Sequence, residues 1–146
     1  YNYMDLNRVG IFGFSAGGYD TVQAMLRHND FFKAGVSASG NHEFRVDKAG
    51  WNEIWMGWPL TEHWHQQSNL TGVERLKGKL LLAHGELDSN VHISATMRLV
   101  DKLIVSNKFF DLLIMPKMGH VLDTHPYYVE KRWRFFLEHL HNMKFE

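Results

Sequence analysis

The 146-residue sequence predicts an α/β fold: a mostly parallel sheet of about four strands, flanked by helices. Two observations support this prediction. Short apolar runs typical of strands alternate with stretches whose apolar residues recur at helical spacing, and the chain shows no internal repeat. Strands that alternate with helices form parallel sheets, because each helix carries the chain back to the same end of the sheet. We therefore expect one domain over residues 1–146, with functional side chains at the carboxyl ends of its strands.

The first half of the chain supplies two of the predicted strands. Residues 8–14 form a β-rich run that turns at Ser15, and residues 17–28 then carry apolar side chains at helical spacing. Residues 34–38 form a second, short strand. Residues 39–70 are rich in Trp, Gly, His and Asn, and we expect loops and short helices there that cover a site.

The second half supplies the other two strands. Residues 79–84 form a nearly continuous apolar run, as expected for a central strand that is covered on both faces. Residues 93–105 place their apolar side chains on one helical stripe. A fourth strand over residues 109–115 stops at Pro116, and residues 127–141 form a closing amphipathic helix.

Composition excludes several classes of function. The 16 basic and 16 acidic side chains balance, so no broad field favours nucleic acid or an anionic membrane, and no apolar run is long enough to span a membrane. The chain has no cysteine, which excludes thiolate catalysis and cysteine metal sites. The histidine pairs at 63 and 65 and at 139 and 141 diverge on a helix, so we expect no metal site, and we expect no cofactor.

A Gly-x-Ser-x-Gly motif at residues 13–17 marks Ser15 as a candidate nucleophile. It stands between a predicted strand and a predicted helix, where a sharp turn exposes a serine and where a residue larger than glycine would clash. The alternative is a flexible turn without catalytic function. If Ser15 is the nucleophile, the N–H of Ala16 opens the next helix and is suited to donate to an oxyanion.

Asp88 is the candidate orienting acid. It follows the strand at residues 79–84 by a few positions, at the carboxyl end where the site is expected, whereas Asp111 begins a strand and falls at the opposite edge. The alternative for Asp88 is a cap on the helix that begins near His92. In a catalytic role it accepts an imidazole N–H and stabilises the imidazolium.

His120 is the candidate base. It lies after Lys117, Met118 and Gly119, in the loop between the last predicted strand and the last predicted helix. His84 is the next candidate, but its place at a strand end beside Gly85 favours a structural role in which it stabilises the turn by hydrogen bonding. The order Ser, Asp, His along the chain indicates acyl transfer, most simply peptide hydrolysis.

These segments together carry a family resemblance over nearly the whole chain. Residues 13–18 read Gly-Phe-Ser-Ala-Gly-Gly, residues 84–91 match His-Gly-x-x-Asp-x-Asn-Val, residues 56–59 match Met-Gly-x-Pro, and His120 stands in the final loop. The sequence resembles the C-terminal part of the α/β-hydrolase domain of the prolyl oligopeptidase family of serine peptidases, most closely the dipeptidyl peptidase IV branch. That branch usually has Gly-Trp-Ser-Tyr-Gly-Gly around its nucleophile.

The resemblance implies roles for individual residues. Ser15 would be the nucleophile, Asp88 the orienting acid and His120 the base of a serine peptidase that cleaves short peptides, and Asn90 would bind a substrate carbonyl unless it is only a turn residue. Where the branch has two tyrosines in its proline-sized pocket, this chain has Asp47 and Trp51. Trp51 is expected either to wall the substrate pocket or to cover the core.

The resemblance also implies that these residues are the C-terminal portion of a larger catalytic domain. The upstream strands and a second oxyanion donor would then lie elsewhere, so we expect weak or no peptidase activity from the 146 residues alone, and self-association through the edge of the first strand. The alternatives are an esterase or acyl-peptide hydrolase with the same triad, or a non-catalytic module. The compartment is left open, and a periplasmic or secreted location is compatible with the resemblance.

Overall fold

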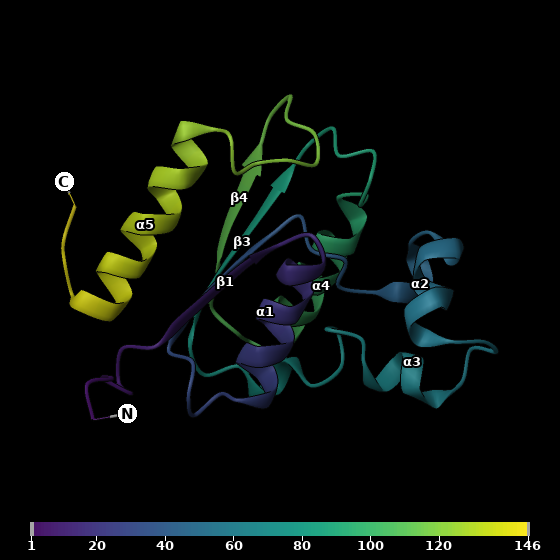
Figure 1. Cartoon of the computed structure of the whole chain (residues 1–146), viewed down its shortest axis with the longest axis horizontal. Coiled ribbons are helices and arrows are strands. Elements are labelled where there is room, and N and C mark those ends of the chain that lie inside the picture. Colours follow the sequence, from purple (N-terminus) through teal and green to yellow (C-terminus); the bar gives the residue numbers. More distant parts are fainter. Residues whose placement is uncertain (1, 146) are drawn as a thin grey trace.

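The computed structural model describes residues 2–145 and contains one sheet of four parallel strands, in the order β1-β2-β3-β4 (Figure 1). The strands are β1 (Gly10–Phe14), β2 (Ala34–Ala38), β3 (Lys79–Gly85) and β4 (Asp111–Met115). Three parallel registers connect them, for example Phe12 with Val36, Val36 with Leu81, and Leu81 with Asp111. The predicted α/β class with a parallel sheet is therefore confirmed, and all four carboxyl ends meet at one edge.

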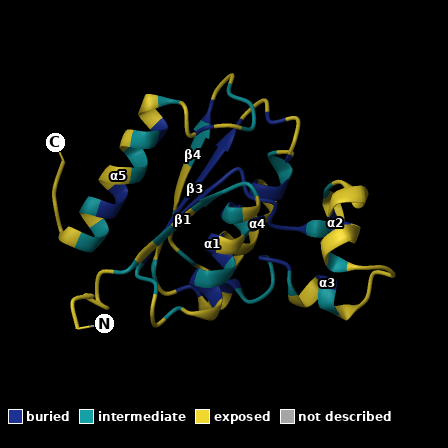
Figure 2. Ribbon diagram, viewed as in Figure 1, coloured by how far each residue is buried: buried dark blue, intermediate teal, exposed yellow. Residues whose placement is uncertain are grey.

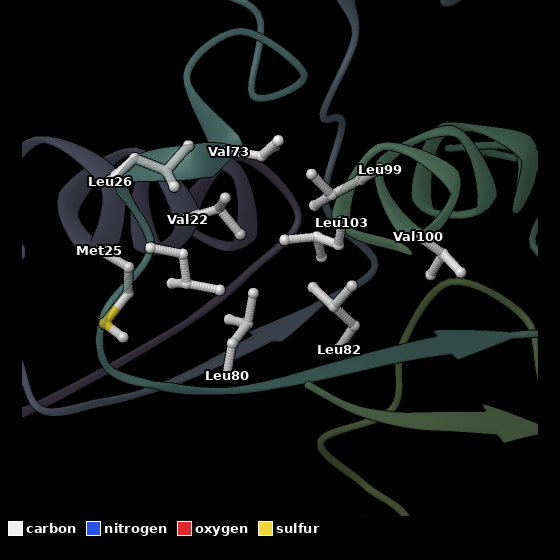
Figure 3. Close-up of a cluster of buried hydrophobic side chains, with 10 residues drawn as sticks. Val22, Met25, Leu26, Val73, Leu80, Leu82, Leu99, Val100 and Leu103 are labelled. Atoms are coloured by element: carbon white, nitrogen blue, oxygen red, sulfur yellow. The ribbon is translucent and has the colours of Figure 1, made fainter. Parts of the chain in front are cut away.

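The helices form a layer on each face of the sheet. Helices α1 (Ala16–Arg27) and α4 (Ser94–Val105) lie on one face, and α5 (Pro126–His141) lies on the other (Figure 1). The buried side chains of β3 show why: Leu80 and Leu82 pack in one core with α1 and α4, whereas Leu81 and Ala83 pack in a second core with α5. Figure 3 shows the first of these cores. Successive strand residues point to opposite faces, so a continuous apolar run fills both cores.

Two of the predicted strands begin earlier in the sequence than the strands of the structure. Arg8 lies outside β1 because its backbone N–H and its guanidinium both bind Asp5 in a turn, at 3.0 Å and 2.6 Å. Phe109 lies outside β4 and is 86% exposed. In both cases the β-rich pattern begins before the first residue that pairs with a neighbouring strand. The pattern alone therefore does not mark where strand pairing begins.

The segment between β2 and β3 contains short helices, as predicted, and is anchored by buried polar groups. Its elements are η1 (Phe44–Val46), α2 (Ala49–Met56), α3 (Glu62–Gln66) and η2 (Val73–Arg75). Glu43 accepts hydrogen bonds from Arg45 and from the Ser68 hydroxyl, and Asn69 donates to His42 Nδ1 at 2.8 Å. Figure 2 shows that α2 itself is largely exposed. This segment is therefore held by its ends, with α2 projecting toward solvent.

The turn between β1 and α1 holds Ser15 in a strained backbone conformation. Ser15 has φ 58° and ψ −119°, which non-glycine residues rarely adopt, and its N–H donates to the carbonyl of Ala38 at 2.9 Å. The prediction that glycines on both sides of Ser15 prevent clashes is only half correct. A Cβ on Gly13 would collide with the Gly17 carbonyl, but a Cβ on Gly17 would meet nothing within 4 Å.

The close contact of α1 with the sheet instead depends on Gly18. A Cβ there would lie 2.6 Å from the carbonyl oxygen of Ala38 and 3.0 Å from the Cα of Gly40. These are backbone atoms, which cannot rotate away as a side chain can. Gly13 and Gly18 therefore set the distance between helix and strand, whereas Gly17 does not.

This difference predicts opposite effects of alanine at neighbouring positions. Gly18→Ala should lower the free energy of unfolding by about 1–3 kcal/mol through overpacking, whereas Gly17→Ala should leave it unchanged or raise it by up to about 1 kcal/mol through helix propensity. Urea denaturation of the two variants compares them directly. Equal destabilisation by both substitutions would contradict the role assigned to Gly18.

A second prediction concerns pH. Burial, with a smaller contribution from nearby His84, lowers the pKa of His42 to about 3. The unfolded chain therefore binds a proton at this residue between about pH 6.5 and pH 3 that the folded chain does not bind. The free energy of unfolding should fall as the pH falls through this window, with His42 contributing about 1.4 kcal/mol per pH unit.

Urea denaturation from pH 7 to pH 4 measures this slope, and His42→Gln should make it shallower whatever its effect on stability at pH 7. Identical slopes in the two proteins would show that His42 does not remain neutral in the folded chain.

No helix in residues 2–145 is long and apolar enough to cross a membrane.

Candidate active site

The carboxyl ends of three strands bring together Ser15, Asp88 and His120. Ser15 follows β1 directly, Asp88 stands three residues beyond β3, and His120 stands five residues beyond β4. His120 Nε2 lies 3.0 Å from Ser15 Oγ, and His120 Nδ1 lies 2.7 Å from Asp88 Oδ2. The three residues selected from the sequence thus form one continuous chain of hydrogen-bonding groups, although they are 105 residues apart at the extremes.

The Asp88 carboxylate is buried, accepts three hydrogen bonds and has the His84 imidazole beside it. Its Oδ1 accepts the backbone N–H groups of Asn90 and Val91, each at 2.9 Å. Its Oδ2 faces His120 Nδ1 at 2.7 Å and His84 Nε2 at 3.1 Å, and its side chain has no exposed surface. Burial of a carboxylate is costly unless hydrogen bonds replace its hydration. These donors supply that replacement and fix the direction in which Oδ2 faces His120.

His84 lies behind Asp88 as a neutral imidazole. Its Nε2 is 2.9 Å from the Val91 carbonyl oxygen, which can only accept, so the proton is on Nε2. Its Nδ1 then accepts from the Thr96 hydroxyl at 2.7 Å. Burial lowers the pKa of His84, although the Val91 carbonyl and Asp88 oppose this effect. The predicted structural role of His84 is confirmed, but its contact with Asp88 was not predicted, because it depends on how the loop folds back.

The alternative role of Asp88 as a helix cap is wrong. Helix α4 begins at Ser94, whose N–H is bound by His92 Nδ1 at 3.2 Å, and Asp88 instead closes the loop before it. As predicted, Asp111 opens β4 at the amino end of the sheet, and its side chain is exposed.

A close contact between two loops positions His120. A Cβ on Gly85 would overlap the carbonyl oxygen of Gly119, so only glycine permits this approach. The N–H of Leu87 donates to the carbonyl of Met118 at 2.8 Å, and the Ser39 hydroxyl donates to the His120 carbonyl at 2.9 Å. Gly85 and Ser39 were not predicted as positioning residues, because their roles depend on how the loops meet.

Ala16 is the first residue of α1 and is exposed beside the nucleophile. The N–H groups of the first helical turn have no acceptor within the helix, and the helix dipole favours negative charge there. The backbone of Ala16 is thus suited to bind an oxyanion.

A pocket of about 640 Å³ lies next to Ala16. Its wall is mainly apolar and contains Ala16, Tyr19, Phe44, Trp51, Trp55 and Met56. Trp51 is 50% exposed and contacts the Trp55 ring edge-on at 5.7 Å between centroids, so the alternative that Trp51 covers the core is wrong. Tyr19, Phe44 and Trp55 were not predicted, because nothing in their local sequence indicates that they meet.

The other two positions singled out from the sequence lie outside this wall. Asp47 accepts a hydrogen bond from Asn41 at 2.8 Å within the loop. Asn90 is exposed, its backbone N–H binds Asp88, and its amide oxygen accepts from the ammonium group of Lys48. Its NH₂ group therefore provides the remaining donor. Within residues 2–145, no cluster of three or more His, Asp or Glu side chains could hold a metal ion.

Comparison with solved structures places this arrangement among known enzymes. The chain superposes on dipeptidyl peptidase 4 of Porphyromonas gingivalis with a TM-score of 0.88 and 30% identity, covering 94% of this chain and 20% of that one. It superposes on a putative dipeptidyl aminopeptidase IV of Bacteroides ovatus with a TM-score of 0.90 and 27% identity, with the same coverage of 94% and 20%. The fold is therefore part of an α/β-hydrolase fold, as expected.

Comparison of sequences agrees. Human and mouse dipeptidyl peptidase 8 are each 32% identical over 125 residues, which is 82% of this chain and 14% of the relative. Dipeptidyl peptidase family member 1 of Caenorhabditis elegans is 32% identical over 136 residues, or 92% of this chain and 17% of that protein. The chain thus spans less than a fifth of the length of these relatives. The model of the Prolyl oligopeptidase family matches residues 1–143. By this match, the chain belongs to the prolyl oligopeptidase family.

Proposed function

We propose that this chain carries the catalytic centre of a serine peptidase that hydrolyses short peptides through an acyl-enzyme, in the manner of the dipeptidyl peptidases it resembles. The observation that carries the proposal is the contact of one imidazole with both a hydroxyl and a buried carboxylate, at 3.0 Å and 2.7 Å. Membership of the prolyl oligopeptidase family supports the same reaction class.

In the proposed mechanism, Ser15 Oγ attacks the scissile carbonyl carbon while His120 Nε2 takes the hydroxyl proton. Asp88 keeps the Nδ1 proton of His120 in place and stabilises the imidazolium. The N–H of Ala16 donates to the oxyanion. His120 then protonates the leaving amine, and water attacks the acyl-enzyme with His120 again as the base.

Two further residues are proposed to bind substrate. Asn90 would donate from its NH₂ group to a substrate carbonyl, since its amide oxygen already accepts from Lys48. Trp51 would provide an apolar wall for a substrate side chain, because it lines the pocket beside Ala16.

We propose, from the sequence resemblance, that residues 1–146 are the C-terminal portion of an α/β-hydrolase catalytic domain. The small share of the matched relatives that this chain covers, 14–20% of their length, agrees with a part of a larger protein. A second oxyanion donor would then come from outside these residues. The loss of one such donor typically costs about 10²- to 10³-fold in rate, so we expect weak turnover of peptide amides by this chain alone.

A fluorophosphonate probe and a chromogenic dipeptide amide test the function together. We expect the probe to label Ser15 of this chain at a low rate, and we expect turnover of the amide about 10²- to 10³-fold below that of a full-length relative. Ser15→Ala should abolish both, whereas Ser89→Ala, which changes an exposed serine near the site, should change neither.

Three outcomes would contradict parts of the proposal. Cleavage of p-nitrophenyl esters without cleavage of amides would indicate an esterase. Absence of labelling even after the chain is joined to the upstream region of a relative would indicate a non-catalytic module. Full amide turnover by the 146 residues would show that no further oxyanion donor is needed.

We also propose that the isolated chain self-associates through β1. In the described sheet β1 pairs only with β2, so its other edge presents unpaired N–H and C=O groups. Phe12 on this strand is 50% exposed and forms an apolar groove with Trp133, Phe136 and Leu140. An apolar strand edge of this kind favours pairing with another chain.

Light scattering at increasing protein concentration tests this proposal. We expect the mean mass to rise above that of a monomer, and Phe12→Lys to suppress the rise because a charge on an edge strand opposes pairing. Phe109→Lys, at an exposed residue outside every strand, is the matched control and should have no effect. A constant monomer mass in the unmodified chain would refute association through this edge.

A further inference from the structure

The apolar pocket described above begins where the substrate side chain must lie. The carbonyl carbon attacked by Ser15 is one bond from the substrate α-carbon, and the oxyanion points to the N–H of Ala16. The side chain on that α-carbon is therefore held within a few ångströms of Ala16, which forms part of the pocket wall. Because Ala16 has only a methyl group and is exposed, its side chain takes up little of the space beside Ser15.

The side chains that line this pocket are suited to bind an aromatic side chain of a substrate. Four aromatic rings from three separate segments surround the space: Tyr19 from α1, Phe44 from η1, and Trp51 and Trp55 from α2. Tyr19 and Phe44 already contact each other, with ring centroids 4.6 Å apart, and Trp51 meets Trp55 edge-on. Further offset or edge-on contacts with a bound ring add to the gain from burying apolar area.

The pocket is held in place from behind. The Tyr19 hydroxyl donates to the Gln67 carbonyl at 2.7 Å, and the Asn69 amide donates to the Tyr19 carbonyl at 3.1 Å. Burial raises the pKa of Tyr19 to about 12, so this hydroxyl remains a donor across the neutral range. A wall that is already ordered loses little entropy when a ligand binds.

The polar groups at this pocket are few. Asp20 is exposed at the wall, and Gln67 is partly buried by its contacts with α1. One exposed carboxylate is well hydrated and gains little from a cationic partner, so charge contributes less here than the four rings. The volume of about 640 Å³ also exceeds what a small side chain would fill.

We propose that this pocket selects substrates with a large aromatic side chain, phenylalanine-like rather than proline-like, on the residue whose carbonyl Ser15 attacks. The inference rests on the proposed peptidase function for its place in the reaction. Trp51, which the sequence resemblance also assigns to the substrate pocket, is the lining residue chosen to test it.

Binding can be tested without catalysis. N-acetyl-phenylalanine amide, N-acetyl-proline amide and N-acetyl-lysine amide are titrated into the isotope-labelled chain, and the indole N–H signals are followed by NMR, with assignments from Trp51→Phe and Trp55→Phe. We expect the phenylalanine ligand to shift the signals of Trp51 and Trp55 and to bind about tenfold more tightly than the other two. Equal or tighter binding of the proline or lysine ligand, or shifts confined to other tryptophans, would overturn the inference.

Labelling tests selectivity at the nucleophile. In a peptidyl diphenyl phosphonate, Ser15 Oγ forms a bond to phosphorus and one phenoxide leaves, protonated by the proton that His120 removed. A phenylalanine-type reagent should label Ser15 about tenfold faster than a proline-type reagent. Trp51→Ala should remove most of this ratio, whereas Trp58→Ala, 72% exposed and outside the pocket, should preserve it.

The two proposals fail in different ways. If neither reagent labels Ser15, and a fluorophosphonate also fails after the chain is joined to the upstream region of a relative, the proposed peptidase function fails. The NMR titration still decides whether the pocket prefers an aromatic ring. If both reagents label Ser15 at equal rates, the function stands and the aromatic preference is refuted.

Discussion

The buried carboxylate of Asp88 is the constraint on which the candidate site depends. Its surroundings require that the loop after β3 folds back on itself to present two backbone N–H groups, that the Nε2–H side of His84 lies 3.1 Å from Oδ2, and that the loop after β4 brings His120 Nδ1 within 2.7 Å. Each of these conditions fixes a different part of the chain. A buried carboxylate with fewer donors would destabilise the fold. The stability of this one group therefore depends on the conformation of both loops at this edge of the sheet.

The sheet explains why so much of this arrangement could be predicted. In a parallel sheet the carboxyl ends of neighbouring strands lie at one edge, so residues that follow β1, β3 and β4 meet whatever their separation in sequence. The Gly-x-Ser-x-Gly motif selected Ser15, and this rule then selected Asp88 and His120 among many aspartates and histidines. It also separated Asp88 from Asp111, which belongs to the opposite edge.

The parts that were not predicted depend on distances that a sequence pattern does not encode. Gly17 and Gly18 are adjacent glycines, and only the position of the Ala38 carbonyl shows that Gly18 cannot be replaced without a shift. Tyr19 of α1 and Phe44 of η1 form one wall because their rings meet in the folded chain, although neither residue belongs to a recognisable motif. The assignment of Trp51 as a pocket wall came from the resemblance, and the structure adds the neighbouring rings with which it acts.

The segment between β2 and β3 is joined to α1 by hydrogen bonds that do not involve the aromatic side chains of α2. The Tyr19 hydroxyl donates to the Gln67 carbonyl, and the Asn69 amide donates to the Tyr19 carbonyl. Ser15, Asp88 and His120 lie outside this segment, in the loops that follow β1, β3 and β4. Substitutions among the exposed aromatic residues of α2 can therefore accumulate without displacing either set of bonds. If the pocket selects substrates as proposed, such an arrangement lets selectivity diverge over evolutionary time while the reaction chemistry is preserved, and it makes α2 a natural region to randomise in directed evolution of new specificities.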